Sequence, residues 1–356
     1  MRIARVLLTA LVFMSVGLEI GAQEPAARTT GFHGFLFGDV VYVARERAAT
    51  DGFFVGQLVG HGNARMSERA SFFGEVSATA RPDGYAFEVE RAILRYDFAD
   101  ALKVSAGRYH TPVSYWNTAY HHGLWLQTSV ARPEIIKVGG RFMPVHFIGL
   151  LAEGTLSAGR LALTYEAGVG NGRGSNFARG GDAGDVNRSR AALLAARLRP
   201  FDAGLQIGGS VYFDRVVTDT LLSTAFDERI TSAHLVWDRG APEFAAEYAR
   251  VRHDPALGGQ ALSSEGWYAQ GAYRLGGVFY RFKPYARIER LDAHAADPVF
   301  TPEMDYRATI AGLRYDFDSF AALKGEYRRE RFGGRADWTN GWYLQVAFAV
   351  ATSGGL

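Results

Sequence analysis

Apolar residues recur at every second position along most of this chain, and this alternation restricts its fold more than any other feature. In one stretch the residues on a single face are Leu161, Leu163, Tyr165, Ala167 and Val169, whereas small and polar residues occupy the other face. A period of two predicts β-strands, because successive side chains of a strand point to opposite sides. Strands with one lipid-compatible face and one small or polar face are typical of a transmembrane β-barrel.

About sixteen segments show this pattern, and most reach the roughly 9–11 residues with which a tilted strand crosses a bilayer. A soluble sandwich would alternate too, but its outward face would be richer in Lys and Glu. No linker or shift in composition divides the chain. We therefore expect one all-β domain, a closed antiparallel barrel of about 16 strands. The segments are 32–44, 52–63, 69–81, 85–98, 101–110, 145–156, 160–170, 189–199, 204–214, 228–238, 243–252, 264–275, 278–291, 304–317, 320–332 and 338–350.

The connections between these segments also alternate in length. Those after even-numbered segments are short, such as Ala99-Asp100 and Asp318-Ser319, whereas most of those after odd-numbered segments are long, such as 111–144. Transmembrane barrels have short periplasmic turns and long outer loops. The alternation therefore predicts that both ends of the barrel chain lie on the periplasmic side.

The beginning of the chain has the features of an export signal. After a basic start, the apolar stretch Val6–Gly17 is followed by the small residues Gly21 and Ala22. This stretch is short for a membrane helix, and no later stretch approaches the roughly 20 apolar residues that a membrane helix needs. We expect a cleaved signal peptide at residues 1–22 and a barrel domain at residues 23–356, exported to the outer membrane of a Gram-negative bacterium.

Composition limits the partners that the chain could have. It has 39 Lys and Arg against 37 Asp and Glu, so the formal net charge is only +2 and we expect no nucleic-acid partner. Cysteine is absent, which suits an exported protein in an oxidising periplasm. The 42 Gly, 17 Tyr and 24 Phe suit twisted strands with aromatic girdles at the two membrane surfaces.

The longest connection, residues 111–144, is unusually aromatic for a solvent-exposed loop. Its aromatic side chains need a surface on which to pack. We expect it to fold into the barrel lumen after strand 5 and to narrow the pore; the alternative is a compact cap outside the barrel. The candidate constriction residues here are Tyr109, Tyr115, Trp116, Asn117, His121, His122 and Arg132.

Charged residues follow the same alternation. The basic residues on one face of the thirteenth segment are Arg281, Lys283 and Arg287. Because a charge facing lipid at mid-membrane costs about 2–4 kcal/mol, this face must line the lumen. We expect Arg91 and Arg95 to line it as well, with acidic residues close by. Facing basic and acidic rows would create a transverse field with a mild anion preference, unless the rows simply neutralise each other.

The chain offers no recognisable catalytic or metal-binding motif. His110, His121, His122 and Glu134 could together suggest a metal, but adjacent histidines point apart in an extended chain and the spacing matches no standard zinc pattern. No Gly-x-Ser-x-Gly nucleophile motif is present. We therefore expect no metal site, no cofactor and no enzymatic activity.

One part of the chain resembles a known family. Residues 87–111 read FEVERAILRYDFADALKVSAGRYHT and resemble the phosphate-selective porin O and P family, as do Pro112 and the pair Trp116-Asn117 that follow. The resemblance covers about residues 70–145 and implies a sixteen-strand trimeric porin. The phosphate-selective members carry lysines in the constriction loop, whereas this loop has only Lys137, so phosphate selectivity is not carried over.

These observations favour an outer-membrane porin, a passive channel for small hydrophilic solutes or anions, with outer-membrane lipid and lipopolysaccharide around it. A transporter of hydrophobic compounds would need an N-terminal plug, which residues 23–31 are too few to form. A non-conducting barrel that acts as adhesin, anchor or assembly partner remains as the alternative, because packing of the long loop decides whether the pore is open.

Overall fold

The computed structural model describes residues 31–351 except for 48–49, 82, 121, 138, 175–176, 178–180, 182–183, 186, 201–203, 218–224, 240, 298, 334 and 336. The expected signal peptide and His121 lie outside the described residues.

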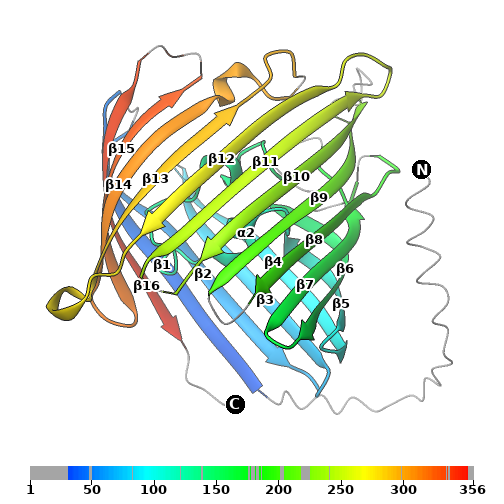
Figure 1. Cartoon of the computed structure of the whole chain (residues 1–356), viewed down its shortest axis with the longest axis horizontal. Coiled ribbons are helices and arrows are strands. Elements are labelled where there is room, and N and C mark those ends of the chain that lie inside the picture. Colours follow the sequence, from blue (N-terminus) through cyan, green and yellow to red (C-terminus); the bar gives the residue numbers. More distant parts are fainter. Residues whose placement is uncertain are drawn as a thin grey trace.

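The described strands form a closed antiparallel barrel of sixteen, in which sequence neighbours pair and β1 closes on β16 (Figure 1). The predicted barrel is confirmed. The strands are β1 (Gly31–Arg45), β2 (Gly52–Arg65), β3 (Ala70–Arg81), β4 (Gly84–Ala99), β5 (Leu102–His110), β6 (His146–Ala158), β7 (Leu161–Asn171), β8 (Ala191–Pro200), β9 (Leu205–Val217), β10 (Ala225–Trp237), β11 (Glu243–Pro255), β12 (Leu262–Ala272), β13 (Phe282–Asp292), β14 (Tyr306–Asp316), β15 (Ala321–Phe332) and β16 (Thr339–Ala351).

Short helical turns occur in the connections. They are α2 (Tyr115–Tyr120), η1 (Glu134–Ile136), η2 (Gly277–Phe279) and η3 (Pro302–Met304). Among the described residues, no helix is both long enough and apolar enough to cross a membrane.

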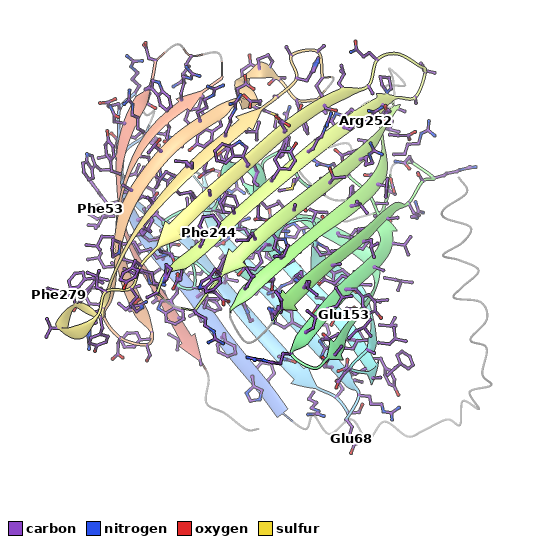
Figure 2. All side chains as sticks on the ribbon, viewed as in Figure 1. Phe53, Glu68, Glu153, Phe244, Arg252 and Phe279 are labelled. Atoms are coloured by element: carbon purple, nitrogen blue, oxygen red, sulfur yellow. The ribbon has the colours of Figure 1, made fainter. Side chains whose placement is uncertain are left out.

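The alternation predicted from the sequence is clear in regular strands such as β13. In β13, Lys283, Tyr285 and Arg287 are buried, whereas Pro284, Ala286 and Ile288 are exposed. Large apolar side chains are exposed on many strands, and Phe53 and Phe244 project from the outer surface in Figure 2. A closed barrel satisfies the backbone hydrogen bonds of every strand, so an apolar outer surface can face lipid. This fold is consistent with a bacterial outer membrane.

The two ends of the barrel differ, as the connection lengths predicted. We call the end with the connections after even-numbered strands the turn end, and the opposite end the loop end. The loop end carries the long connections 111–145, 172–190 and 293–305. Strand β1 begins and β16 finishes at the turn end (Figure 1).

The predicted segments 264–275 and 278–291 left only Gly276-Gly277 between them, and this prediction of a two-residue turn is wrong. Strand β12 ends at Ala272 and β13 begins only at Phe282, with η2 in between. Val278 and Phe279 lie in this connection with 87% and 59% of their surface exposed, and Phe279 projects at the turn end (Figure 2). The apolar alternation continues past the end of β12 and begins before the start of β13, so the sequence pattern alone extended both strands too far into this connection.

A β-bulge in β4 changes which side chains face the interior. Glu75 of β3 pairs with Arg91, but Val76 pairs with Val89, so Glu90 is an extra residue in β4. A bulge shifts the two-residue alternation by one position. Glu90 and Arg91, although adjacent, therefore both lie on the interior side, where Arg91 contacts Glu75 at 2.5 Å.

Candidate functional site

The connection 111–145, here called the inner segment, crosses the barrel interior to the opposite wall. Glu247 of β11 is 3% exposed, and its carboxylate accepts the backbone N–H of Tyr115 at 2.5 Å and of Trp116 at 3.1 Å. The hydroxyl of Ser114 donates to the same carboxylate at 3.2 Å. Because the first N–H groups of a helix have no partner within it, Glu247 satisfies the donors at the start of α2.

Basic side chains of β13, β14 and β15 hold the middle of the inner segment. Arg287 donates to the backbone oxygen of Ala131 at 2.8 Å, and Arg314 donates to that of Gln127 at 2.8 Å. Lys324, which is fully buried, donates to the backbone oxygen of Leu124 at 2.5 Å. These cations are therefore used to position the inner segment.

Two carboxylates on the same wall bind backbone N–H groups of the inner segment. Glu326 of β15 accepts the N–H of Val130 at 2.9 Å, and Glu289 of β13 accepts the N–H of Glu134 at 2.6 Å. Burial raises the pKa of the Glu134 carboxyl, although Lys137 at 3.0 Å opposes this effect. The inner segment is thus held to the wall by both signs of charge.

The inner segment also buries an apolar core inside the barrel. Trp116 is completely buried and meets Tyr268 of β12 edge to face, with ring centroids 5.6 Å apart. Ile135, Ile136 and Phe142 are each at most 2% exposed. Aromatic pairs of this kind stabilise packing beyond the apolar area that they bury. The middle of the barrel is consequently filled by protein on the side of β11 to β15.

Several of the predicted constriction residues serve to shape the inner segment. The Asn117 amide donates to the backbone oxygens of Thr111 at 3.1 Å and Val145 at 2.9 Å, and so joins the two ends of the segment. The hydroxyl of Tyr109 donates to Ser105 on the wall. Burial lowers the pKa of Arg132 to about 10, so its guanidinium stays charged at neutral pH.

The three basic residues predicted to form one row, Arg281, Lys283 and Arg287, lie in different surroundings. Lys283 and Arg287 face the interior, but both are buried, and they contact Glu243 at 2.6 Å and Glu289 at 2.7 Å. Arg281 precedes β13 and donates to the hydroxyl of Tyr280 at 3.0 Å, at the turn end. The structure therefore does not bring the three side chains together as one open row.

The turn-end half of the barrel wall from β4 to β8 carries partly exposed charges. Arg95 has a 38% exposed side chain and contacts Asp97 at 2.8 Å and Glu153 at 3.5 Å. Arg197 contacts Glu166 at 2.8 Å. The residues of this group, here called the vestibule charges, are Arg95, Asp97, Lys103, Glu153, Glu166, Arg197 and Arg199. Of the basic ones, only Arg95 was singled out from the sequence, although Arg197 and Arg199 follow the interior alternation of β8.

Arg173 is a structural anchor that sequence reasoning missed. It follows β7, is 1% exposed and contacts Glu228 of β10 at 2.9 Å. It also donates to the backbone oxygens of Arg141 at 2.6 Å and Phe142 at 2.9 Å. Arg173 thereby joins the connection 172–190 to the end of the inner segment. No local pattern marks it, because its partners are distant in sequence.

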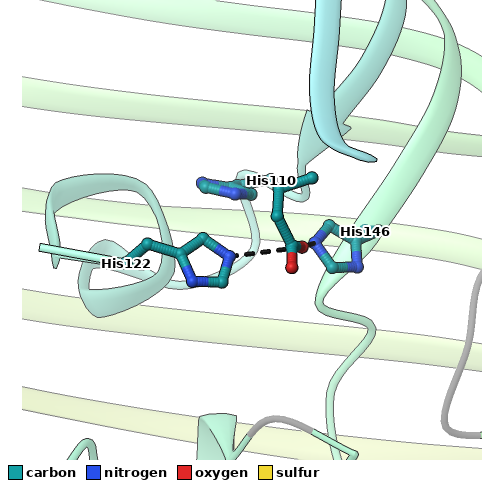
Figure 3. Close-up of side chains that lie close together, drawn as sticks. His110, His122 and His146 are labelled. Carbon is teal, nitrogen blue, oxygen red and sulfur yellow. Dashed lines mark ion pairs between the residues drawn. The ribbon is translucent and has the colours of Figure 1, made fainter. Parts of the chain in front are cut away.

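Three histidines gather around one carboxylate near the loop end. Glu90 Oε2 lies 3.2 Å from Nε2 of His122 in the inner segment and 2.9 Å from Nε2 of His146 in β6. Figure 3 shows the three histidines close together, with dashed lines marking ion pairs. His110 of β5 completes the group, and one ligand-type atom from each residue lies within 4.8 Å of the others. Of the residues that the sequence offered as a metal group, His110 and His122 belong to this cluster, whereas Glu134 instead contacts Lys137 at 3.0 Å.

Comparison with known proteins identifies the fold. No protein-family model matches the sequence, and no curated protein matches it either. Several solved structures match this chain, and each of those named here covers 90% of it. One is an anion-selective porin from Comamonas acidovorans, which is 13% identical, covered over 98% of its chain and has a TM-score of 0.64. Another is OmpF of Salmonella typhi in complex with daunomycin, which is 12% identical, covered over 97% of its chain and has a TM-score of 0.60. A third is a trimer form of OmpT, an outer membrane protein of Vibrio cholerae, which is 14% identical, covered over 98% of its chain and has a TM-score of 0.57.

At these identities the likeness concerns the fold. The chain has the closed sixteen-strand barrel of porins, as expected from its alternation. The similar structures do not single out the phosphate-selective O and P family, whose resemblance in residues 87–111 stays a sequence observation.

Proposed function

We propose that this protein is an outer-membrane porin, a passive, non-enzymatic channel for small hydrophilic solutes in which the inner segment forms the narrowest part. The observation that carries the proposal is the attachment of the inner segment to the opposite wall through Glu247, Arg287 and Lys324. A buried charge is retained only with good partners, so these contacts hold one arrangement of the segment. A rigid constriction is what a size-selective diffusion channel needs.

The vestibule charges supply a weak anion preference. Basic groups slightly outnumber acidic ones among them, and several side chains remain partly exposed to solvent. Lys283 and Arg287 contribute less than their sequence pattern suggests, because each is buried against a carboxylate. The preference should weaken as salt rises, since screening acts over about 8 Å at physiological ionic strength. One of the similar structures is described as anion-selective, in line with this proposal.

The assembly proposed is a homotrimer embedded in lipid and lipopolysaccharide, after removal of a signal peptide at residues 1–22. Support for the trimer comes from a similar structure described as a trimer form. Support for the lipid contact comes from the apolar residues exposed on the barrel surface.

Single-channel recording in planar bilayers tests the function. The purified protein should give discrete conductance steps, and deletion of Tyr115–Gln127 should enlarge them while the unboiled barrel still migrates anomalously on a detergent gel. The reversal potential in a KCl gradient should show a weak preference for chloride. A folded deletion variant with unchanged conductance would contradict the role of the inner segment.

The apolar core inside the barrel favours a second candidate, a non-conducting barrel that acts as an adhesin, anchor or assembly partner. Trp116 and Phe142 fill interior volume that an open pore would leave to water. Under this alternative the natural protein would give no conductance steps, and only the deletion variant would conduct. The same recordings therefore separate the two functions.

A further inference from the structure

We propose that Glu90, His110, His122 and His146 bind a divalent transition-metal ion of the zinc type, which fastens the inner segment to the barrel wall. The four residues come from β4, β5, the inner segment and β6, and the three histidines are labelled in Figure 3. The proposal concerns metal binding and does not depend on whether the barrel conducts.

The donor set matches what zinc prefers. Three imidazole nitrogens and one carboxylate oxygen are common zinc ligands, and imidazole also suits copper and nickel. With bonds of about 2.0–2.2 Å, neighbouring ligand atoms in a tetrahedron lie about 3.3–3.6 Å apart. Glu90 Oε2 already lies 3.2 Å from His122 Nε2 and 2.9 Å from His146 Nε2. The whole set falls within 4.8 Å, so small side-chain rotations would close it around an ion.

The fold places these ligands in advance. Glu90 is the extra residue of the β4 bulge, and bulges commonly redirect a side chain next to a functional site. His110 and His146 are paired in register at the point where β5 and β6 meet. All three histidines and Glu90 are largely buried, which excludes water from competing for the site.

A second layer of contacts orients two of the ligands. The Nδ1 atom of His122 lies 2.6 Å from the side-chain oxygen of Gln57, which leaves Nε2 directed at Glu90. Histidines that bind metals usually direct their other ring nitrogen to an oxygen in this way. The hydroxyl of Ser77 donates to Glu90 Oε1 at 2.5 Å, so Oε2 is the oxygen turned to the histidines.

Nearby cations oppose the ion and set a limit on its affinity. Arg108 lies 3.7 Å from Glu90 Oε2, and the charge of Arg132 also acts on Glu90. The charge of Arg91 is offset by Glu75, which in turn lies 3.4 Å from His110 Nε2. Without a metal, Glu90 would simply accept hydrogen bonds from the imidazoles. A metal site and a purely hydrogen-bonded cluster can therefore be distinguished by measuring whether the chain binds metal.

Metal titration of the untagged, full-length barrel tests the proposal. After treatment with EDTA, the protein in detergent should bind one Zn²⁺ per chain by calorimetry, and Co²⁺ should give the visible spectrum of a four-coordinate ion. His122→Gln should weaken Zn²⁺ binding by at least roughly 10–100-fold, the loss typical of even an outer contact. His234→Gln, which removes an interior histidine of β10 outside the cluster, is the matched control and should bind like the natural protein.

Two further results make the outcome decisive. Arg108→Gln removes the competing cation and should tighten Zn²⁺ binding, whereas a purely structural cluster would show no such gain. Zn²⁺ should raise the thermal midpoint of the natural protein but not that of His122→Gln, because ligands stabilise only the state that binds them. No saturable Zn²⁺ binding by the natural barrel, or equal binding by a folded His122→Gln variant, would overturn the proposal.

Discussion

Glu247 of β11 accepts the backbone N–H of Trp116 at 3.1 Å, and this contact joins residues 131 positions apart across the interior of the barrel. The carboxylate is buried, and so are Trp116 and Asn117 in the helical turn that it caps. The contact is therefore one of several that hold the inner segment in place, and its removal tests how much of that position depends on Glu247.

Glu247→Ala should loosen the inner segment while the barrel remains closed. The variant loses an acceptor for Ser114, Tyr115 and Trp116, and a hydrogen bond to a charged group contributes about 1.5–3 kcal/mol. We expect larger and more variable single-channel currents. Glu303→Ala, at an exposed position in η3, is the control. Currents as steady as those of the natural protein would show that other contacts suffice to hold the segment.

Arg197→Gln combined with Arg199→Gln should move the reversal potential toward cations. Both side chains belong to the vestibule charges, and their removal lowers the local concentration of anions. The change should be largest at low salt. Arg250→Gln alters a charge on the outward face of β11 and should leave selectivity unchanged. If the double variant keeps the original reversal potential, the vestibule charges do not control permeation.

Ile288→Arg should destabilise the barrel by about 2–4 kcal/mol, the cost of a basic side chain facing lipid at mid-membrane. Ile288 is exposed near the middle of β13, between the interior residues Arg287 and Glu289. Denaturant unfolding in lipid vesicles measures the change, with Ile288→Leu as the control. Equal stability of the two variants would mean that this face is not in contact with lipid.

Arg173→Met should lower the free energy of unfolding by about 3–5 kcal/mol, because it leaves the buried carboxylate of Glu228 without its guanidinium partner. It also removes donors to the backbone of Arg141 and Phe142. Arg190→Met, at an exposed position in the same connection, should change stability little. The same unfolding measurement applies, and a loss no larger than that of the control would argue against the anchoring role of Arg173.

Much of the barrel could be predicted from the sequence, because strand alternation is a local property. The buried Lys283, Tyr285 and Arg287 and the exposed Ala286 and Ile288 follow directly from a period of two. The prediction was wrong at the β12–β13 connection for a reason that is also local. Val278 and Tyr280 continue the alternation, so residues 273–275 and 278–281 were expected to be strand on either side of a two-residue turn.

The arrangement of the interior needed the tertiary structure. One extra residue in β4 brings both Glu90 and Arg91 to the interior side, and no feature of their sequence distinguishes that bulge from regular strand. Lys283 and Arg287 were expected to line the lumen, but whether they meet water depends on the inner segment that covers them.

The sequence by itself determined most of the strand segments, the outward side of the regular strands and the end of the barrel that carries the long connections. Each of these depends on the spacing of neighbouring residues. Only the tertiary structure decided that Trp116 meets Glu247 and that His110, His122 and His146 surround Glu90. Such contacts depend on strand register and on how a long connection fills the interior, and these arise from the simultaneous packing of residues far apart in the chain.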